Sequence, residues 1–291
     1  MGDATALSLL TSLMSLLQRF LDITIQTGGA IGRRVEDVLI AMSYISEQDC
    51  KDLFIELKIV PILIQLINCD DPNIEYFALR IVADISSASV DHTQFLLEAD
   101  VLPVLFRKLT DLNRTESYDY GIDLEAMRFQ SYILEGSTKQ VNAVVDHGLL
   151  QIMKHLLING NYKVKDMVVI AVKNATRGSN KAIFYFVENG FIPPLCEVLK
   201  YGDSTTSEDI LTALSNLLFL AGEPGLRRSI CEAIEMAGGL ETIQNLIYCK
   251  NYELSDLADE ILELYFADDD ATSDEEDMKN NQDEAVNRFD F

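Results

Sequence analysis

Apolar positions in this sequence follow a pattern that recurs along the chain. Each copy has two apolar residues, a proline or another residue in its place, and then apolar residues two, five and six positions further on, as in Ile59–Ile67 and Phe191–Leu199. Apolar residues at this spacing lie on one face of an α-helix. A proline is accepted in the first turn of a helix, where its missing N–H has no intrahelical partner to lose. The pattern therefore predicts one short amphipathic helix in each copy.

The copies recur at a nearly constant distance. With the proline or its equivalent as reference, they lie at residues 11, 61, 103, 151, 193 and 241, which are 50, 42, 48, 42 and 48 residues apart. A shorter apolar segment ending in an acidic residue precedes the helix in five units, and a polar turn and a longer apolar segment follow it. We call the helix expected in that longer segment the third helix. The third helices are expected at 76–85, 124–134, 164–175, 209–220 and 253–266.

Three helices per unit and a period in the forties are typical of armadillo repeats, whereas HEAT units have two helices. The sequence therefore predicts an all-α fold, an armadillo-repeat solenoid wound as a right-handed superhelix. We expect the solenoid at residues 1–266, with about five repeats after an incomplete first one, and a disordered acidic tail at 267–291. The first unit starts at its second helix, so apolar side chains from Ala6 to Leu17 are expected at an open end of the stack.

Several segments resemble the importin α family, the adaptors that carry cargo proteins with nuclear localisation signals. The segments that carry this resemblance are 41–46, 78–85, 173–178, 192–199, 235–241, 262–266 and the final Phe289-Asp290-Phe291. The resemblance runs from about Leu9 to the C-terminus. It covers only the C-terminal part of the family's repeat array.

The resemblance implies a peptide-binding groove along the third helices. In the family, a Trp and an Asn four residues later, taken from successive repeats, hold an extended basic peptide. The Trp-equivalent positions of this sequence hold Ile40, Arg80, Arg128, Ile170 and Thr212, and the Asn-equivalents are Tyr44, Asp84, Tyr132, Asn174 and Asn216. The residues expected to line a cargo-peptide groove are Arg80, Asp84, Arg128, Ser131, Tyr132, Ile170, Asn174 and Asn216. A cation at Arg128 repels an incoming lysine, so the hypothesis is that ordinary basic signals bind weakly.

The end of the array implies further partners. In the family, the last repeats and the acidic tail contact the exportin that recycles importin α together with Ran-GTP. The residues expected at a surface of that kind are Ile234, Glu235, Tyr265 and Phe266. Importin β is not expected as a partner, because the basic N-terminal segment with which family members bind it has no counterpart here.

Two functions remain open from the sequence. The leading one is an importin-α-like adaptor, truncated or divergent, that binds cargo peptides and transport factors in nuclear protein import. The alternative is an armadillo protein-binding scaffold that has lost recognition of nuclear localisation signals. An enzyme is not expected, because no group of nucleophile, base and orienting residue is recognisable, and no cofactor is implied.

Composition narrows the partners further. The formal net charge of the 291 residues is −24, which favours basic partners and opposes binding to nucleic acid or to an anionic membrane surface. The five cysteines show no Cys-x-x-Cys or Cys/His spacing, so we expect no metal site and a reducing compartment. No apolar run of about 18 residues and no signal peptide are recognised. The expected location is the cytoplasm and the nucleus.

Overall fold

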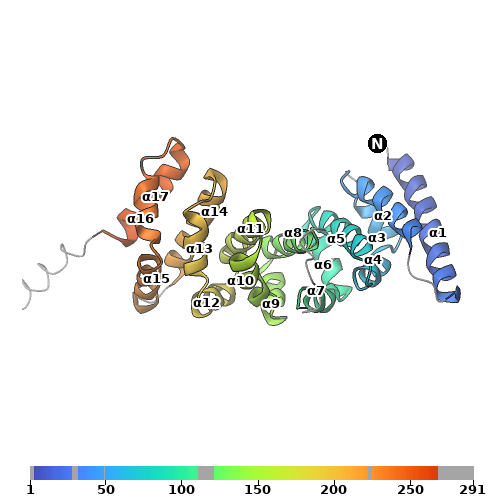
Figure 1. Cartoon of the computed structure of the whole chain (residues 1–291), viewed down its shortest axis with the longest axis horizontal. Coiled ribbons are helices and arrows are strands. Elements are labelled where there is room, and N and C mark those ends of the chain that lie inside the picture. The colour runs from blue at the N-terminus through green and yellow to red at the C-terminus, as the bar shows by residue number, and fades with distance from the viewer. Residues whose placement is uncertain (1–2, 28–31, 49, 111–120, 222–223, 268–291) are drawn as a thin grey trace, which may run out of the picture.

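A computed structural model describes residues 3–27, 32–48, 50–110, 121–221 and 224–267. Within these residues all regular structure is helical, in 17 α-helices, and no strand is present. Figure 1 shows the helices stacked side by side into a curved rod, with the N-terminal helix at one end and α17 near the other. The predicted all-α solenoid is confirmed.

The helices repeat in groups of three after the first two. The first helices of the groups are α3 (Asp52–Glu56), α6 (Val90–Glu98), α9 (Thr138–Asp146), α12 (Asn180–Glu188) and α15 (Pro224–Met236). The second helices are α4 (Val60–Ile67), α7 (Val101–Thr110), α10 (Leu149–Asn159), α13 (Ile192–Leu199) and α16 (Gly239–Leu246). The third helices are α5 (Pro72–Ser86), α8 (Ile122–Glu135), α11 (Tyr162–Gly178), α14 (Ser204–Leu220) and α17 (Tyr252–Tyr265). We interpret α1 (Asp3–Thr27) and α2 (Arg33–Ser46) as the second and third helices of an incomplete first unit.

Local sequence signals fix where the helices begin. The carboxylate of Asp71 accepts hydrogen bonds from the backbone N–H groups of Asn73 (3.1 Å) and Ile74 (3.3 Å), and Pro72 is the first residue of α5. The side chains of Ser137 and Gln140 form a reciprocal capping box at the start of α9. Such caps replace hydrogen-bond partners that a first helical turn lacks. The polar turns read from the sequence therefore become helix starts.

The apolar faces form one continuous core. Buried side chains from α1 to α17 are in contact along the length of the rod, and the largest of them include Phe54, Phe129, Phe186 and Phe191. The third helices stack directly on one another, α2 on α5 and so on to α17, which forms one uninterrupted row (Figure 1). Each unit covers its neighbour's apolar face, as expected for a repeat protein.

The N-terminal helix α1 ends the stack. Leu10 and Leu17 are fully buried, whereas Leu7, Leu9 and Leu16 are 42%, 44% and 41% exposed. The expectation that no apolar run has the length of a membrane span is wrong for this helix, because Ala4–Asp22 has a mean hydropathy of 1.3 over an 18-residue window. Only 17% of that window is buried. A single helix of this kind also occurs in soluble proteins and in signal sequences, so it is weak evidence for a membrane.

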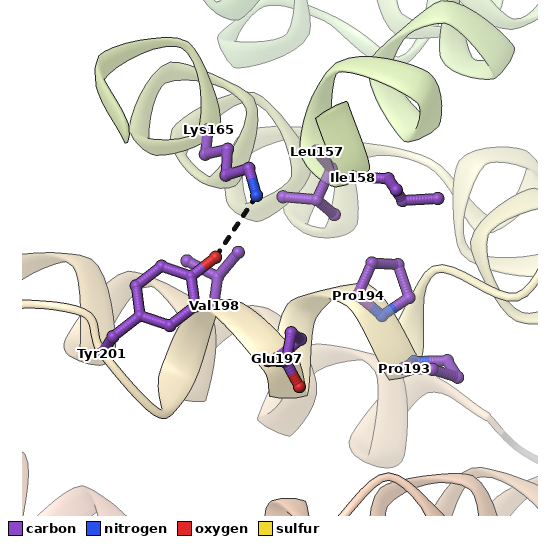
Figure 2. Close-up of a pocket in the computed structure, with 8 residues that line it drawn as sticks. All are labelled: Leu157, Ile158, Lys165, Pro193, Pro194, Glu197, Val198 and Tyr201. Carbon is purple, nitrogen blue, oxygen red and sulfur yellow. Dashed lines mark hydrogen bonds between the residues drawn. The ribbon is translucent and has the colours of Figure 1, made fainter. Parts of the chain in front are cut away.

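A cavity of about 310 Å³ lies between α10 and α13, beside the first turn of α11 (Figure 2). Its apolar walls are Leu157 and Ile158 on one side and Pro193, Pro194 and Val198 on the other. The predicted disordered tail at 267–291 lies outside the described residues apart from Ala267.

Candidate peptide-binding groove

The eight residues expected in the groove all lie on four successive third helices, α5, α8, α11 and α14. Because these helices stack side by side, side chains about 40 to 50 residues apart in sequence come into contact. The groove positions therefore form one row across the repeats, in which every residue except Ile170 is polar. The contacts within this row determine which groups remain available to a ligand.

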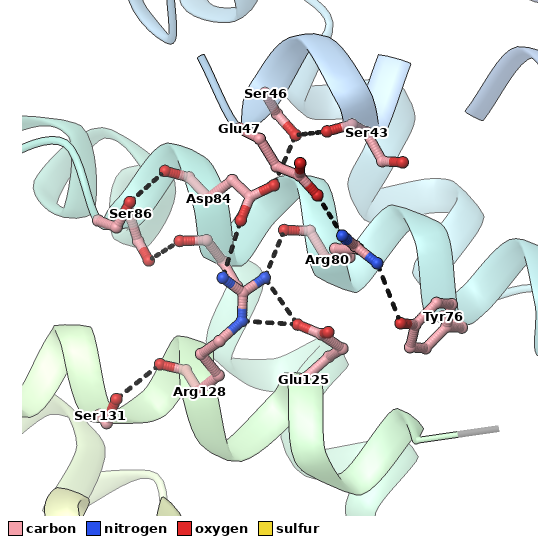
Figure 3. A network of polar contacts seen from close by, with 12 residues as sticks. Ser43, Ser46, Glu47, Tyr76, Arg80, Asp84, Ser86, Glu125, Arg128 and Ser131 are labelled. Carbon is pink, nitrogen blue, oxygen red and sulfur yellow. Dashed lines mark hydrogen bonds and ion pairs between the residues drawn. The ribbon is translucent and has the colours of Figure 1, made fainter. Parts of the chain in front are cut away.

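Arg128 is the centre of a buried ion-pair network (Figure 3). Its guanidinium donates to Asp84 Oδ1 at 2.8 Å and to Glu125 Oε2 at 2.7 Å, and it also reaches the backbone carbonyl of Arg80 at 3.2 Å. The Arg128 side chain is 25% exposed, whereas those of Asp84 and Glu125 are 7% and 9% exposed. Burial disfavours the charged guanidinium, but attraction by Glu125 and the hydrogen bond to Asp84 outweigh burial, so the pKa of Arg128 is raised. Arg128 thus remains charged and forms ion pairs with the carboxylates of both Asp84 and Glu125.

Asp84 has partners on both of its carboxylate oxygens. The hydroxyl of Ser46 on α2 donates to Asp84 Oδ2 at 2.6 Å, while Arg128 on α8 holds Oδ1. Asp84 therefore joins three neighbouring third helices and is buried. The residue expected to face a peptide serves mainly as a link between repeats.

Arg80 is in a more open position than Arg128. It forms an ion pair with Glu47, just after α2, and donates to the hydroxyl of Tyr76 at 3.3 Å. The side chains of Arg80 and Glu47 are 32% and 39% exposed. This pair lies at the surface of the groove and is screened by solvent.

The two retained asparagines also bridge neighbouring repeats. Asn174 on α11 donates to the backbone carbonyl of Ser131 on α8 at 3.2 Å, and Asn216 on α14 donates to the Thr176 hydroxyl on α11 at 3.1 Å. The Ser131 hydroxyl in turn donates to the backbone carbonyl of Arg128 at 2.8 Å. Asn174 is only 8% exposed, whereas Asn216 is partly exposed. The amide N–H groups of Asn174 and Asn216 that make these hydrogen bonds can bind a ligand only if the hydrogen bonds break.

Tyr132 and Ile170 are half-buried on α8 and α11. A further ion pair, Lys173 Nζ to Asp209 Oδ1 at 2.5 Å, joins α11 to α14. Four carboxylates on the third helices from α5 to α14 are thus paired with cations of this chain, those of Glu75, Asp84, Glu125 and Asp209. A basic peptide finds fewer unpaired carboxylates on this wall than the sequence suggests.

The expected exportin-type surface is only partly available. Ile234 is fully buried, so its side chain packs in the core of the rod and is not a surface residue. Glu235 is exposed, and Tyr265 and Phe266 are half-buried at the end of α17. The Arg227 guanidinium lies 5.8 Å from the centroid of the Tyr265 ring. For Ile234 the expectation was wrong, because helical periodicity turns this residue towards the core.

Sequence reasoning missed the partners of the two arginines. Glu125 lies three residues before Arg128 on one helix, so this pair could have been found from the i, i+3 spacing. Ser46 and Glu47 come from the preceding unit, and only stacking places them beside Asp84 and Arg80. Within the described ranges, no three His, Cys, Asp or Glu side chains gather in a group able to hold a metal ion.

Comparisons with known families agree with the observed fold. Residues 179–219 match the family described as Armadillo/beta-catenin-like repeat, and residues 228–281 match the Atypical Arm repeat. A designed armadillo repeat protein solved in complex with the peptide (KR)4 superposes with a TM-score of 0.72 at 22% identity, covering 87% of this chain and 99% of the design. A structure of computationally designed armadillo repeat proteins for modular peptide recognition has a TM-score of 0.73 at 22% identity, covering 86% of this chain and 98% of the design.

Curated relatives are importin alpha subunits. Importin subunit alpha-4 of Arabidopsis thaliana is 33% identical over 242 residues, which cover 80% of this chain and 44% of the relative. Importin subunit alpha-1b of Oryza sativa subsp. japonica is 30% identical over 264 residues, which cover 88% of this chain and 47% of the relative. The chain spans about half of the length of these relatives.

Proposed function

Because the chain is an importin-alpha-like armadillo protein, we propose that it is an adaptor that binds extended peptide segments of other proteins in nuclear protein import. The observation that carries the proposal is the uninterrupted row of third helices, which presents polar side chains at each repeat from α5 to α14. A peptide in extended conformation needs hydrogen-bond partners at regular intervals, and amide side chains supply both donor and acceptor. The adaptor would act in the cytoplasm and the nucleus.

The ion pairs favour a second candidate, a scaffold that binds peptides without selecting basic signals. Arg128 already occupies the carboxylates of Asp84 and Glu125, which a lysine of a basic peptide would need. A bound lysine must displace Arg128 or remain unpaired beside a like charge, and both cost free energy. This section of the groove is therefore closed to basic side chains unless Arg128 moves.

Fluorescence anisotropy with a labelled lysine-rich peptide and a neutral extended peptide of equal length tests both candidates. We expect the lysine-rich peptide to bind with a Kd above about 10 µM, equivalent to a binding free energy weaker than about −7 kcal/mol. Arg128→Ala should tighten its binding by roughly tenfold, because Asp84 and Glu125 become available to it. Arg80→Ala serves as the matched control and should change the Kd less than threefold. Submicromolar binding of the lysine-rich peptide by the unchanged chain would contradict the conclusion that Arg128 blocks basic side chains. Failure of both peptides to bind would refute the proposal that the chain is a peptide-binding adaptor.

The transport role needs a separate test. The retained Glu235, Tyr265 and Phe266 support an exportin-type partner surface at the end of the rod. A pull-down of the full chain with the recycling exportin should succeed with GTP-loaded Ran and fail with GDP-loaded Ran. Reversal of Glu235 to Lys should weaken the complex, whereas the same reversal of Glu241, also an acidic residue near this end, is the control. Absence of the complex under GTP-loaded conditions would leave the scaffold as the better description.

A further inference from the structure

The cavity between α10 and α13 has the shape and the polarity of a site for one aromatic side chain. Its volume of about 310 Å³ exceeds that of a single phenylalanine side chain, and most of its lining is apolar (Figure 2). Ile158 on its edge is 51% exposed. An exposed apolar hollow of this kind gains stability when a hydrophobic group covers it.

The rim of the cavity carries two charged side chains, Lys165 and Glu197 (Figure 2). Lys165 donates to the Tyr201 hydroxyl at 3.3 Å and lies 5.9 Å from the centroid of its ring. The Glu197 carboxylate is paired with Lys200 at 2.7 Å, whereas Lys165 forms no ion pair within the described residues. Residues 154–200 contain seven lysine or arginine residues and three acidic ones, a net charge of +4 in a chain of −24. Three of these cations are already paired, Lys173 with Asp209, Lys181 with Asp146 and Lys200 with Glu197, so Lys165 is the cation that remains available at the cavity.

We propose that the C-terminal segment of the same chain, residues 268–291, binds this site with Phe289 or Phe291 in the cavity. The segment has ten acidic and two basic residues, a net charge of −8, and it ends in Phe-Asp-Phe. Its charge is complementary to that of Lys165, and its terminal aromatic residues fit the apolar walls.

The segment is long enough to reach the cavity. It follows α17, and the cavity lies between the second helices of the two units before the last one. Packed helices are about 10 Å apart, so the path is a few tens of ångströms. An extended chain of 24 residues spans up to about 80 Å. The terminal phenylalanines therefore reach the cavity without any change in the rod.

Tethering makes weak affinity sufficient. One buried aromatic ring and one screened ion pair give a Kd of about 1 mM between separate molecules. A flexible tether of this length supplies an effective concentration of about 1 mM, so about half of the molecules hold the segment in the cavity at any time. An added acidic peptide has to reach millimolar concentration to compete.

Site-specific photo-crosslinking in the full chain tests the proposal. The photoreactive residue p-benzoylphenylalanine replaces Ile158 at the cavity or, as the matched control, Phe184 on α12, which has the same exposure of 51%. Both positions are at the surface, so both variants should fold. The products are identified by mass spectrometry at about 1 µM protein, where contacts between molecules are rare.

We expect the probe at position 158 to capture residues 286–291 of its own chain at least fivefold more often than the probe at position 184. Substitution of both Phe289 and Phe291 by alanine should lower the yield at least threefold, and 0.5 M NaCl should lower it because the ion pair is screened. Equal yields from the two probes, or a yield unaffected by the alanine substitutions, would overturn the proposal. A yield that rises in proportion to protein concentration would also overturn it, since the occupant would then be another molecule.

Discussion

Removal of Arg128, whose carboxylate partners are buried, should destabilise the fold far more than removal of Arg80, whose partner is exposed. The substitution is Arg128→Met, with Arg80→Met as the matched control on the preceding third helix. Methionine keeps most of the aliphatic volume in both cases, so the difference reports mainly on charge. Arg128 holds two carboxylates that are 7% and 9% exposed, whereas Arg80 holds one that is 39% exposed.

The magnitude follows from this difference in burial. Removing one partner of a buried ion pair costs roughly 3–5 kcal/mol, because the remaining charge stays buried without a counter-charge. The 25% exposure of Arg128 admits some solvent, so we expect a loss of about 3 kcal/mol in the free energy of unfolding. An exposed pair contributes at most about 1 kcal/mol, which is the limit for Arg80→Met. At about 2–3 °C per kcal/mol for a chain of this size, the expected Tm shifts are roughly 6–9 °C and less than about 3 °C.

Thermal unfolding followed by circular dichroism measures both shifts under identical conditions. A third variant, Arg128→Met combined with Asp84→Asn and Glu125→Gln, removes the charges together and should recover more than half of the lost stability. Equal losses from Arg80→Met and Arg128→Met would refute the reasoning. So would a triple variant no more stable than Arg128→Met, because the penalty would then not arise from unpaired carboxylates.

Further predictions concern buried polar groups away from the groove. Gln130 is fully buried and neither of its amide atoms has a hydrogen-bond partner, so Gln130→Met should raise the free energy of unfolding by about 1–2 kcal/mol. Gln140→Met is the control, because this equally buried amide donates to the Val90 carbonyl at 2.9 Å, and it should lower the free energy of unfolding by about 1–2 kcal/mol. Denaturant titrations should therefore show changes of opposite sign for the two variants, and changes of the same sign would contradict the prediction. Burial raises the pKa of the Cys196 thiol from 9.0 to about 12, so native Cys196 should resist alkylation at pH 8 until the chain unfolds, and labelling in the folded state would contradict this. Above pH 9 the Cys196 thiol ionises in the unfolded chain but stays protonated in the native chain. Its contribution to the free energy of unfolding should therefore be fully present below pH 9 and should fall between pH 9 and about 12.

The groove shows where sequence reasoning reached its limit. The row of candidate residues was implied by the resemblance to the importin α family, and all eight lie on successive third helices. Their partners were not predicted, with the result that Asp84 and Asn174 appeared to be available to a ligand. Ile234 was assigned to a surface although it faces the core.

The sequence by itself determined the helices, their grouping in threes and the solenoid, because periodic apolar residues, first-turn prolines and polar turns act within a few residues of one another. The tertiary structure decided which charges of the groove are already paired. Arg80 meets Glu47 across 33 residues, and Arg128 meets Asp84 across 44. These residues, far apart in the sequence, come into contact only when one unit stacks on the next. The register of that stacking determines which partner each side chain contacts.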